Sequence, residues 1–231
     1  MPHLISVIIP TLNEVESLGP TISAIKELRG NIEIIVVDGG STDGTVDLAK
    51  ASGAGTLIGL CGRGTQMRAG AAVARGDVLW FLHADTIPDS TAIDVIEAAL
   101  RDAAVAGGNF RIEFDGDTRP ARFMSWLYPK LRRIGLVYGD SAIFVRRAAY
   151  EKIGGFNPLP LFEDLDLVRR LRDEGKFVHL SAIVVTSSRR FAGRSFLLMF
   201  ARWSILQVLF WFGVNPNFLA TLYRPNGSRY D

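Results

Sequence analysis

The sequence predicts an α/β fold in which a mostly parallel β-sheet carries helices on both of its faces. Short, continuous apolar runs at Leu4–Ile9, Ile32–Val37 and Val78–Leu82 are typical of strands that lie buried inside a parallel sheet. Stretches with helical character separate these runs. Strands that alternate with helices form right-handed crossovers, and such crossovers build layered α/β proteins.

The other elements of the first half follow in chain order. A weaker strand is expected at Thr56–Leu60. Helices are expected near residues 15–29, 42–51, 64–75 and 89–102. We therefore expect residues 1–105 to form a Rossmann-like half of nucleotide-binding type.

In the second half of the sequence, predicted strands and helices do not alternate regularly. Strands are expected at Asn109–Phe114, Ala142–Val145 and within Phe177–Thr186, helices at Thr118–Arg133 and Glu163–Glu174, and a turn at Gly154–Gly155. The sequence has no internal repeat, low-complexity tract or linker. Residues 1–231 are therefore expected to form a single domain, with residues 106–190 as its second half.

Composition excludes several classes of protein. With 48% hydrophobic and 22% charged residues, the chain can bury a full core, so intrinsic disorder is excluded. Its 26 basic and 24 acidic residues are too evenly matched for a dedicated nucleic-acid binder. The single cysteine, Cys61, excludes an intrachain disulfide and a cysteine-based zinc site. Residues Met1–Leu4 lack the basic segment of a signal peptide, so a reducing, cytoplasmic location is expected.

The C-terminal stretch is unusually aromatic. Residues 191–231 hold ten of the 23 aromatic residues. From Phe196 to Val214 the chain is apolar on nearly every helical face, but Arg202 interrupts it, which argues against a membrane span. Two interpretations stay open. Residues 191–214 form either a peripheral membrane contact, at the inner face of the membrane, or a helix buried in the core or in a homodimer.

Polar side chains follow three of the predicted strands. They are Pro10, Thr11, Asn13 and Glu14 after the first, Asp38, Ser41 and Asp43 after the second, and His83 and Asp85 after Val78–Leu82. Ligands of open parallel sheets lie beyond the carboxyl ends of the strands. A carboxylate there can accept from a nucleobase, hold a ribose hydroxyl or bind a hard cation. Taken singly, Asn13, Ser41 and Asp43 could instead be helix caps.

The loop Gly62–Arg68 is a candidate anion site. Its glycines precede a predicted helix, and Arg63 and Arg68 could both contact a diphosphate. The dinucleotide fingerprint would place G-x-G-x-x-G directly after the first strand, where this chain has Pro10–Glu14. This difference excludes a nicotinamide-dependent dehydrogenase.

Two further acidic positions are chemical candidates. A cation that bridges a diphosphate needs only one or two protein ligands, so Asp85, with His83 as second ligand, could hold Mn²⁺ or Mg²⁺. Asp164 falls on the apolar arc of the helix Glu163–Glu174, as either its N-cap or a desolvated acid or base. Asp166, Arg169, Arg170 and Asp173 are expected on the opposite, solvated face.

The sequence resembles the family 2 glycosyltransferases, which have the GT-A nucleotide-sugar fold. The resemblance rests on Pro10–Glu14, Val36–Thr45, Gly76–Asp85, Ile153–Phe156, and Glu163–Asp164 followed by Arg169–Leu171. Its size and its Gly-Arg-Gly-x-Gln loop, which includes Gln66, are most similar to a short bacterial subgroup associated with radical-SAM and selenium genes. The sequence departs from the family pattern at two places. His83 stands where many members have an aspartate, so one metal carboxylate is missing, and Arg68 lies near a place where an asparagine is common.

The resemblance implies an inverting, metal-dependent transferase that uses a nucleotide-diphospho-sugar, UDP-linked, and a hydroxyl acceptor. It assigns the nucleotide to Pro10, Thr11, Asn13, Glu14, Asp38, Ser41, Arg63, Gln66 and Arg68, the Mn²⁺ or Mg²⁺ ion to Asp85 and His83, the acceptor to Gly139, Asp140 and Glu163, and the general base to Asp164. Residues 106–190 would then be the acceptor and catalytic half. The membrane-like C-terminus suggests a lipid-linked or membrane-proximal acceptor, and a soluble acceptor stays open as the alternative.

Three other functions are alternatives to glycosyl transfer. A sugar nucleotidylyltransferase would need a glycine-rich basic loop directly after the first strand, which is absent. A non-catalytic module that binds nucleotide-sugars or lies on a membrane is the second alternative. It would explain why His83 replaces an aspartate that holds the metal in many members of the family. Nucleic-acid binding could use the basic and aromatic residues of 119–133, but Asp115 and Asp117 lie beside them.

Overall fold

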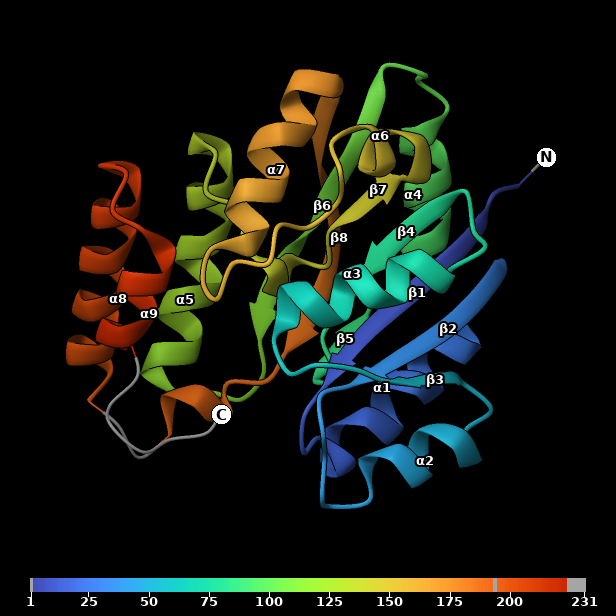
Figure 1. The fold of residues 1–231 in the computed structure, drawn as a ribbon, viewed down its shortest axis with the longest axis horizontal. Coiled ribbons are helices and arrows are strands. Elements are labelled where there is room, and N and C mark those ends of the chain that lie inside the picture. The colour runs from blue at the N-terminus through green and yellow to red at the C-terminus, as the bar shows by residue number, and fades with distance from the viewer. Residues whose placement is uncertain (1, 193–194, 224–231) are drawn as a thin grey trace.

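A computed structural model describes residues 2–192 and 195–223, which form an eight-stranded sheet with helices on both faces (Figure 1). The first half contains β1 (Leu4–Thr11), α1 (Val15–Glu27), β2 (Asn31–Asp38), α2 (Thr45–Ala51), β3 (Gly55–Ile58), α3 (Arg63–Val73) and β4 (Val78–Phe81). All four strands and all four helices predicted for residues 1–105 are confirmed, with ends that shift by a few residues.

Residues 1–105 also contain β5 (Thr86–Pro88) and α4 (Ala92–Leu100), the fourth predicted helix. The second half then runs through β6 (Val105–Phe114), α5 (Arg119–Leu131), β7 (Phe144–Arg146), α6 (Arg147–Lys152), α7 (Glu163–Glu174) and β8 (Lys176–Thr186). Short 3-10 turns span Arg132–Ile134, Gly139–Ser141 and Arg189–Phe191. The chain continues into α8 (Phe196–Trp211) and α9 (Pro216–Tyr223). The short elements β5 and α6 were not predicted, because three and six residues are too few to show a period.

The strand order is β3-β2-β1-β4-β7-β6-β8-β5. The block β3-β2-β1-β4 is entirely parallel, as its continuous apolar runs predict. Strand β7 pairs antiparallel with both β4 and β6, β8 runs parallel to β6, and β5 pairs antiparallel with β8. The sheet is thus parallel through the nucleotide-type half and mixed through the second half.

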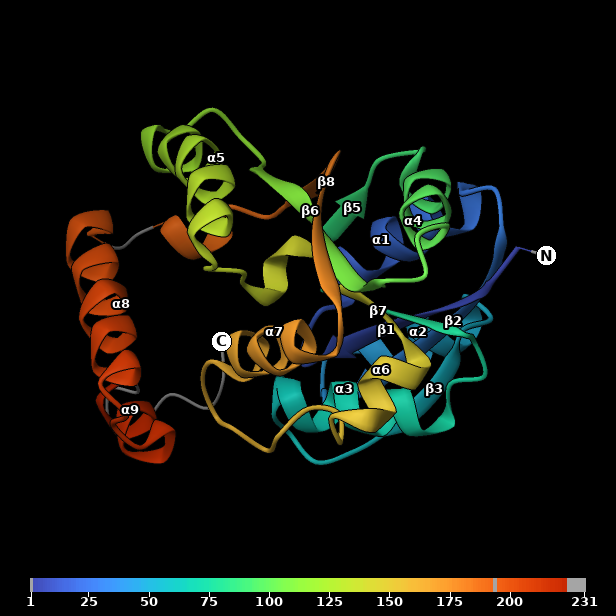
Figure 2. The ribbon, with the colours of Figure 1, turned by 90° about the horizontal axis from the view of Figure 1, so that it is seen from above.

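Two apolar clusters hold the layers together. Ile5, Val7 and Ile9 of β1 face α1 and α4, whereas Ile8 faces α3 and α7 on the opposite side. Figure 2 shows α1 and α4 on one side of the sheet and α3, α6 and α7 on the other. This alternation along β1 is the two-residue period of a strand that is buried on both faces.

Helix α3 lies unusually close to the sheet. A Cβ atom at Gly70 would lie 2.5 Å from Cγ2 of Ile8, so only glycine allows this approach. The close contact fixes the N-terminus of α3, and with it Arg63, at the carboxyl edge of the parallel strands.

Helices α8 and α9 form the outer edge of the molecule beside α5 (Figure 1). Phe196 and Phe200 of α8 contact Phe123 of α5 through their rings. The opposite face of α8 is open to solvent, and Leu197 there is 77% exposed. One face of α8 packs against the core and the other is exposed, so complete burial of this helix in the core is wrong, whereas a membrane contact and a homodimer interface both stay open for residues 191–214. Within the described residues, none of the helices is long and apolar enough to cross a bilayer.

Candidate active site

The loop after β2 is built around Asp38. Its buried carboxylate accepts hydrogen bonds from Thr11 Oγ1 (3.1 Å), from the backbone N–H groups of Gly40 and Ser41 (both 2.8 Å), and from the Ser41 hydroxyl. These four bonds use the acceptor capacity of the carboxylate. Asp38 therefore orders the glycine turn in this structure. Its predicted contact with a nucleobase stays a prediction, and that contact would require the loop to open.

The loops after β1 and β2 are fastened to each other. The Asn13 N–H donates to Ser41 Oγ (2.8 Å), and the Thr42 N–H donates to Asn13 Oδ1 (2.9 Å). Asp43 accepts from the first-turn N–H of α1 at Val15 and from Thr45 at the start of α2, so it is the residue that acts as a helix cap. Asn13 and Ser41 instead join the two strand ends into one wall, to which Pro10, Thr11 and Glu14 also belong.

Gln66 and Arg68 have structural partners in this structure, and their predicted contact with the nucleotide stays a prediction. The buried Gln66 amide donates to the carbonyl oxygens of Thr11 and Val37, both at 2.8 Å, and so ties α3 to the ends of β1 and β2. Arg68 Nη1 donates to the carbonyl oxygens of Gly154 (3.1 Å) and Phe156 (2.7 Å). The sequence pattern missed these roles because the acceptors are backbone groups that only the fold brings near.

Arg63 lies at the first position of α3 and faces the start of α7. Its Nε forms an ion pair with Glu163 Oε1 at 3.1 Å. Glu163 raises the pKa of the Arg63 guanidinium, with further contributions from Asp140 and Asp164, and these outweigh the opposing effect of burial. A Cβ atom at Gly64 would lie 3.2 Å from Cβ of Glu163, so the two helix starts touch. Arg63 therefore supplies a positively charged side chain between the starts of α3 and α7.

Asp140 and His83 form a second buried pair. His83 Nδ1 lies 3.1 Å from Asp140 Oδ1, and Arg190 Nη1 lies 3.0 Å from Asp140 Oδ2. Burial opposes ionisation of Asp140, but Arg190 and His83 outweigh it and hold the pKa of this carboxyl well below its usual range. Asp140 is thus a fixed anion that orients the imidazole, and it leaves His83 Nε2 as the ring nitrogen available to the site.

Asp164 has the environment of a general base. Its side chain is 7% exposed, and it accepts from the backbone N–H groups of Gly139 (2.5 Å) and Leu165 (2.7 Å). Burial, with a smaller contribution from the neighbouring Glu163 charge, raises the pKa of Asp164 to about 7, although Arg63 lowers it. The N-cap of α7 is Phe162, so the alternative in which Asp164 caps this helix is wrong.

His83 and Asp164 line the same space. A Cβ atom at Gly139 would lie 3.3 Å from His83 Nε2 and 3.4 Å from Asp164 Oδ2. The 3-10 turn Gly139–Ser141 therefore brings the strand end of β4 and the start of α7 together, and the absence of a side chain at Gly139 keeps this space open.

Phe162, immediately before Glu163 and Asp164, has φ of 62°, a left-handed conformation that a bulky residue rarely adopts. Its ring packs against Phe210 of α8, with ring centroids 4.7 Å apart. Strained backbone of this kind is concentrated at functional sites, where surrounding contacts hold it. The contact thus connects the C-terminal helix to the position of Asp164.

Asp85 lies in a third group, with Glu14 and Arg189. Arg189 Nη2 forms an ion pair with Glu14 Oε1 and lies 3.5 Å from Asp85 Oδ2. Sequence reasoning assigned no site function to Arg189 and Arg190. The signal that could have found them is their place just beyond the end of β8, one of the strands that run parallel in this sheet.

The acidic side chains of the site fit a divalent cation that takes most of its ligands from the substrate. Among residues 2–192 and 195–223, no group of three or more His, Cys, Asp or Glu side chains is arranged to hold a metal on its own. Among the described residues, the carboxylates of Glu14, Asp85, Asp140 and Glu163 pair with three guanidinium groups, those of Arg63, Arg189 and Arg190, and with His83, and Asp164 adds a further carboxylate. In the described part of the chain, one oxygen each of Glu14 and Glu163 is buried without a hydrogen-bond partner. This excess of negative charge favours a divalent cation.

Asp166 is not on a solvated face, which corrects the sequence prediction. It is buried and accepts from Arg170 (2.7 and 2.9 Å) and from the Asn157 amide (2.8 Å). Arg170 also donates to the carbonyl oxygen of Ile153. The loop before α7 covers this side of the helix, and helical periodicity alone does not reveal such a cover.

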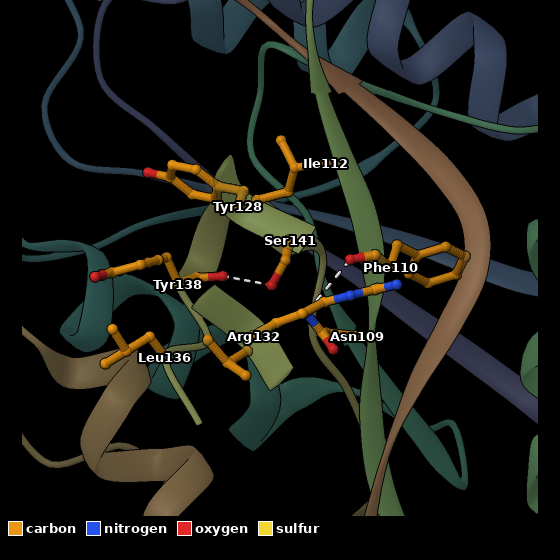
Figure 3. A pocket seen from close by; sticks show the side chains of 9 residues that line it. Asn109, Phe110, Ile112, Tyr128, Arg132, Leu136, Tyr138 and Ser141 are labelled. Carbon is orange, nitrogen blue, oxygen red and sulfur yellow. Dashed lines mark hydrogen bonds between the residues drawn. The ribbon is translucent and has the colours of Figure 1, made fainter. Parts of the chain in front are cut away.

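A small pocket lies behind the Gly139–Ser141 turn (Figure 3). Its volume is about 10 Å³, and residues of β6, α5 and the segment that leads into the turn line it, including Phe110, Tyr128 and Tyr138. Ligand pockets usually measure about 300–1,000 Å³, so this pocket is too small for a nucleotide-sugar. The Ser141 hydroxyl donates to the Tyr138 carbonyl oxygen at 2.5 Å and holds the turn between the pocket and Asp164.

Comparison with known proteins identifies relatives. A family model described as Glycosyl transferase family 2 matches residues 6–153, well over half of the chain. Over 214 residues the chain is 27% identical to "Probable glycosyltransferase YdaM" of Bacillus subtilis (strain 168), which covers 79% of the chain and 50% of that protein. The chain spans half or less of the length of the curated relatives that it matches.

Solved structures share the fold. One is a mannosyltransferase from Pyrobaculum calidifontis in complex with GDP-Man and Mn²⁺, with 19% identity, a TM-score of 0.66, and coverage of 80% of this chain and 57% of that chain. Another is glucosyl-3-phosphoglycerate synthase from Mycobacterium tuberculosis in complex with Mg²⁺ and UDP, with 20% identity, a TM-score of 0.65, and coverage of 90% and 78%. These likenesses confirm the predicted GT-A fold class.

Proposed function

This chain belongs to glycosyl transferase family 2, and from this premise we propose that it is an inverting, divalent-metal-dependent transferase. It moves a sugar from a nucleotide-diphospho-sugar, UDP-linked, to an acceptor hydroxyl. The observation that carries the proposal is the buried Asp164, held by the Gly139 N–H and placed next to His83 across an open space.

The donor lies along the carboxyl edge of the parallel strands. The wall of Pro10, Thr11, Asn13, Glu14 and Ser41 flanks the nucleoside, Asp38 keeps that wall ordered, and Arg63 faces the diphosphate. The relatives solved with GDP-Man and with UDP support a nucleotide at this fold position. A divalent cation held by Asp85, with His83 Nε2 as second ligand, would supply charge neutralisation for the leaving diphosphate.

Asp164 removes the proton from the acceptor hydroxyl. The hydroxyl oxygen then forms a bond to the anomeric carbon, on the face opposite the diphosphate, while the carbon–oxygen bond to the diphosphate breaks. The nucleoside diphosphate departs with the bonding electron pair, so the configuration inverts. A pKa near 7 leaves Asp164 partly ionised at neutral pH and basic enough to accept the proton. Gly139, Asp140 and Glu163 border the acceptor side.

The acceptor is lipid-linked, and the protein meets it at a membrane surface. Leu197, Ile205 and Val208 of α8, and Phe212 at its C-cap, are exposed on one side of the helix. Residues 191–230 contain no Asp or Glu, so the surface that α8 and α9 add carries no negative side chain to repel anionic lipid. A second copy of the chain is the competing occupant of this face.

A substitution pair on α7 tests the proposed function. Asp164→Asn should reduce release of UDP from UDP-sugars by at least about 100-fold, because general-base catalysis contributes roughly 10²–10⁴-fold. UDP binding should persist in this variant, because the carboxylate faces the acceptor. Asp173→Asn, an exposed acid on the same helix, is the matched control.

A set of donors distinguishes this function from its alternatives. UDP-sugars and GDP-mannose are each tested with Mn²⁺, and both binding of the donor and release of the nucleoside diphosphate are measured. Equal turnover in wild type and Asp164→Asn would contradict the base assignment. Binding without turnover in the wild type would favour a non-catalytic module, and pyrophosphate release from a nucleoside triphosphate would favour a nucleotidylyltransferase.

A further inference from the structure

Arg189 connects two loops that are distant in sequence. Its Nη2 pairs with Glu14 after β1 and approaches Asp85 after β4, and its Nη1 donates to Ser17 Oγ at 3.2 Å. The side chain itself belongs to the turn that follows β8. One guanidinium thus lies between the nucleoside wall and the carboxylate that is proposed to hold the cation.

The contacts of Arg189 contribute little to the stability of the fold. The Arg189 side chain is 50% exposed, and exposed ion pairs stabilise a fold little. Glu14 is mostly buried, yet among the described residues its Oε2 has no hydrogen-bond partner. A buried acceptor left unsatisfied destabilises the fold. The arrangement therefore holds negative charge that a ligand could neutralise better than Arg189 does alone.

The neighbouring Arg190 provides a comparison within the same turn. It pairs with the buried Asp140 at 3.0 Å, and its guanidinium lies 5.9 Å from the centre of the Trp203 ring of α8. Arg190 is thus held between a buried anion and an aromatic ring, whereas Arg189 is half exposed and, among the described residues, contacts Glu14, Asp85 and Ser17. Of these two arginines, Arg189 is the one that can exchange its partners.

We propose that Arg189 binds the donor diphosphate, and that it leaves Asp85 for the phosphate oxygens when a divalent cation takes its place on that carboxylate. This inference rests on the proposed function. A cation on Asp85 would repel the adjacent guanidinium, while the diphosphate attracts it. Arginine suits this exchange, because its planar fork can bind a carboxylate or a phosphate through two parallel hydrogen bonds.

The exchange predicts effects of opposite sign on two ligands. The metal alone must displace Arg189 without a phosphate to receive it, so Mn²⁺ alone should bind weakly to the wild type. Mn²⁺ and a nucleoside diphosphate should strengthen each other's binding, because the diphosphate accepts the guanidinium that the metal releases. A residue that only supports the fold would affect both ligands in the same direction.

The experiment measures binding by calorimetry for Mn²⁺ alone, for UDP with Mn²⁺, and for uridine with Mn²⁺. Arg189→Ala should bind Mn²⁺ more tightly and UDP at least about tenfold more weakly, the loss expected for one charge-assisted hydrogen bond, while uridine binding is unchanged. Arg189→Lys should recover part of the UDP affinity. Arg122→Ala, which breaks an exposed ion pair with Asp117, is the control and should change nothing.

Parallel losses of UDP and uridine affinity, or unchanged UDP affinity in Arg189→Ala, would overturn the inference while leaving the proposed function intact. A wild-type protein that binds no nucleoside diphosphate would instead contradict the proposed function and, with it, this inference. Melting temperatures of all variants show that the comparison is made between folded proteins.

Discussion

At the scale of single residues, the site separates its carboxylates by environment. Asp140 pairs with Arg190 and His83 and stays ionised, whereas the buried Asp164 forms no ion pair with any residue that the structure describes and has a pKa of about 7. Two carboxylates from different elements therefore have different protonation states near neutral pH. Such a division is typical of active sites in which one acid is structural and another transfers a proton.

The raised pKa predicts that Asp164 lowers the stability of the fold at high pH. Its pKa is 3.8 when unperturbed and about 7 in the folded protein, so the folded state retains a proton that the unfolded state loses between these values. Stability therefore falls as pH rises from about 4 to 7. Asp164→Asn should raise the free energy of unfolding at pH 8 by about 4 kcal/mol, with little effect at pH 4.

Urea denaturation at pH 4 and pH 8 measures this difference, and Asp173→Asn serves as the exposed control. An Asp164→Asn variant that is destabilised equally at both pH values would show that the carboxylate contributes hydrogen bonds but no unfavourable charge. Such a result would contradict the environment described for Asp164.

At the scale of elements, α3 and α8 position the site from opposite sides. Helix α3 approaches β1 closely at Gly70 and places Arg63 at the strand edge. Helix α8 packs against α5 and contacts Phe162 through Phe210, while its other face is apolar and exposed. One helix is thus fixed by the core, and the other presents a surface that nothing within the described residues covers.

Gly70→Ala should destabilise the protein by about 1–3 kcal/mol. The added methyl group would meet the Ile8 side chain at 2.5 Å, and overpacking of a close helix–strand contact forces both to shift. Ala72→Ser, an exposed position on the same helix, should change stability by less than about 0.5 kcal/mol. Equal melting temperatures for Gly70→Ala and the wild type would show that α3 can move away from β1 at little cost.

Leu197→Glu and Ile205→Glu, made together, should abolish binding to vesicles that contain phosphatidylglycerol. Both side chains are exposed on the open side of α8, so the fold should tolerate the change, while carboxylates there would be repelled by anionic lipid. Leu60→Glu, at an exposed apolar residue elsewhere, is the control. Vesicle flotation measures binding. A double variant that keeps its vesicle binding but changes from dimer to monomer would assign this face to a second copy instead.

At the scale of the whole molecule, ligand binding should stabilise the fold by joining its two halves. The site collects side chains from the ends of β1, β4 and β8 and from the start of α7, so bound donor would contact both halves. UDP with Mn²⁺ at about 100 times its dissociation constant should add about 2.7 kcal/mol to the free energy of unfolding. Thermal melts with and without EDTA test this, and equal shifts in both would contradict a role for the metal.

Much of this architecture could be predicted from the sequence, because local patterns determine it. The buried strands β1, β2 and β4 are continuous apolar runs, and Asp164 was singled out by its place on the apolar arc of α7. The elements β5 and α6 are too short to show a period. The structural contacts of Arg68 and Gln66 could not be predicted, because their acceptors are backbone carbonyl groups of distant segments. Local sequence cannot reveal partners that only the tertiary fold brings together.

The most direct test of Asp164 as the general base is the pH dependence of kcat/KM for UDP release from the donor. The raised pKa predicts a rate that increases with pH and reaches half its maximum near pH 7, since kcat/KM reports groups of the free enzyme. A rate that is already maximal at pH 5, as expected for an ordinary surface aspartate, would contradict the assignment of Asp164 as the general base.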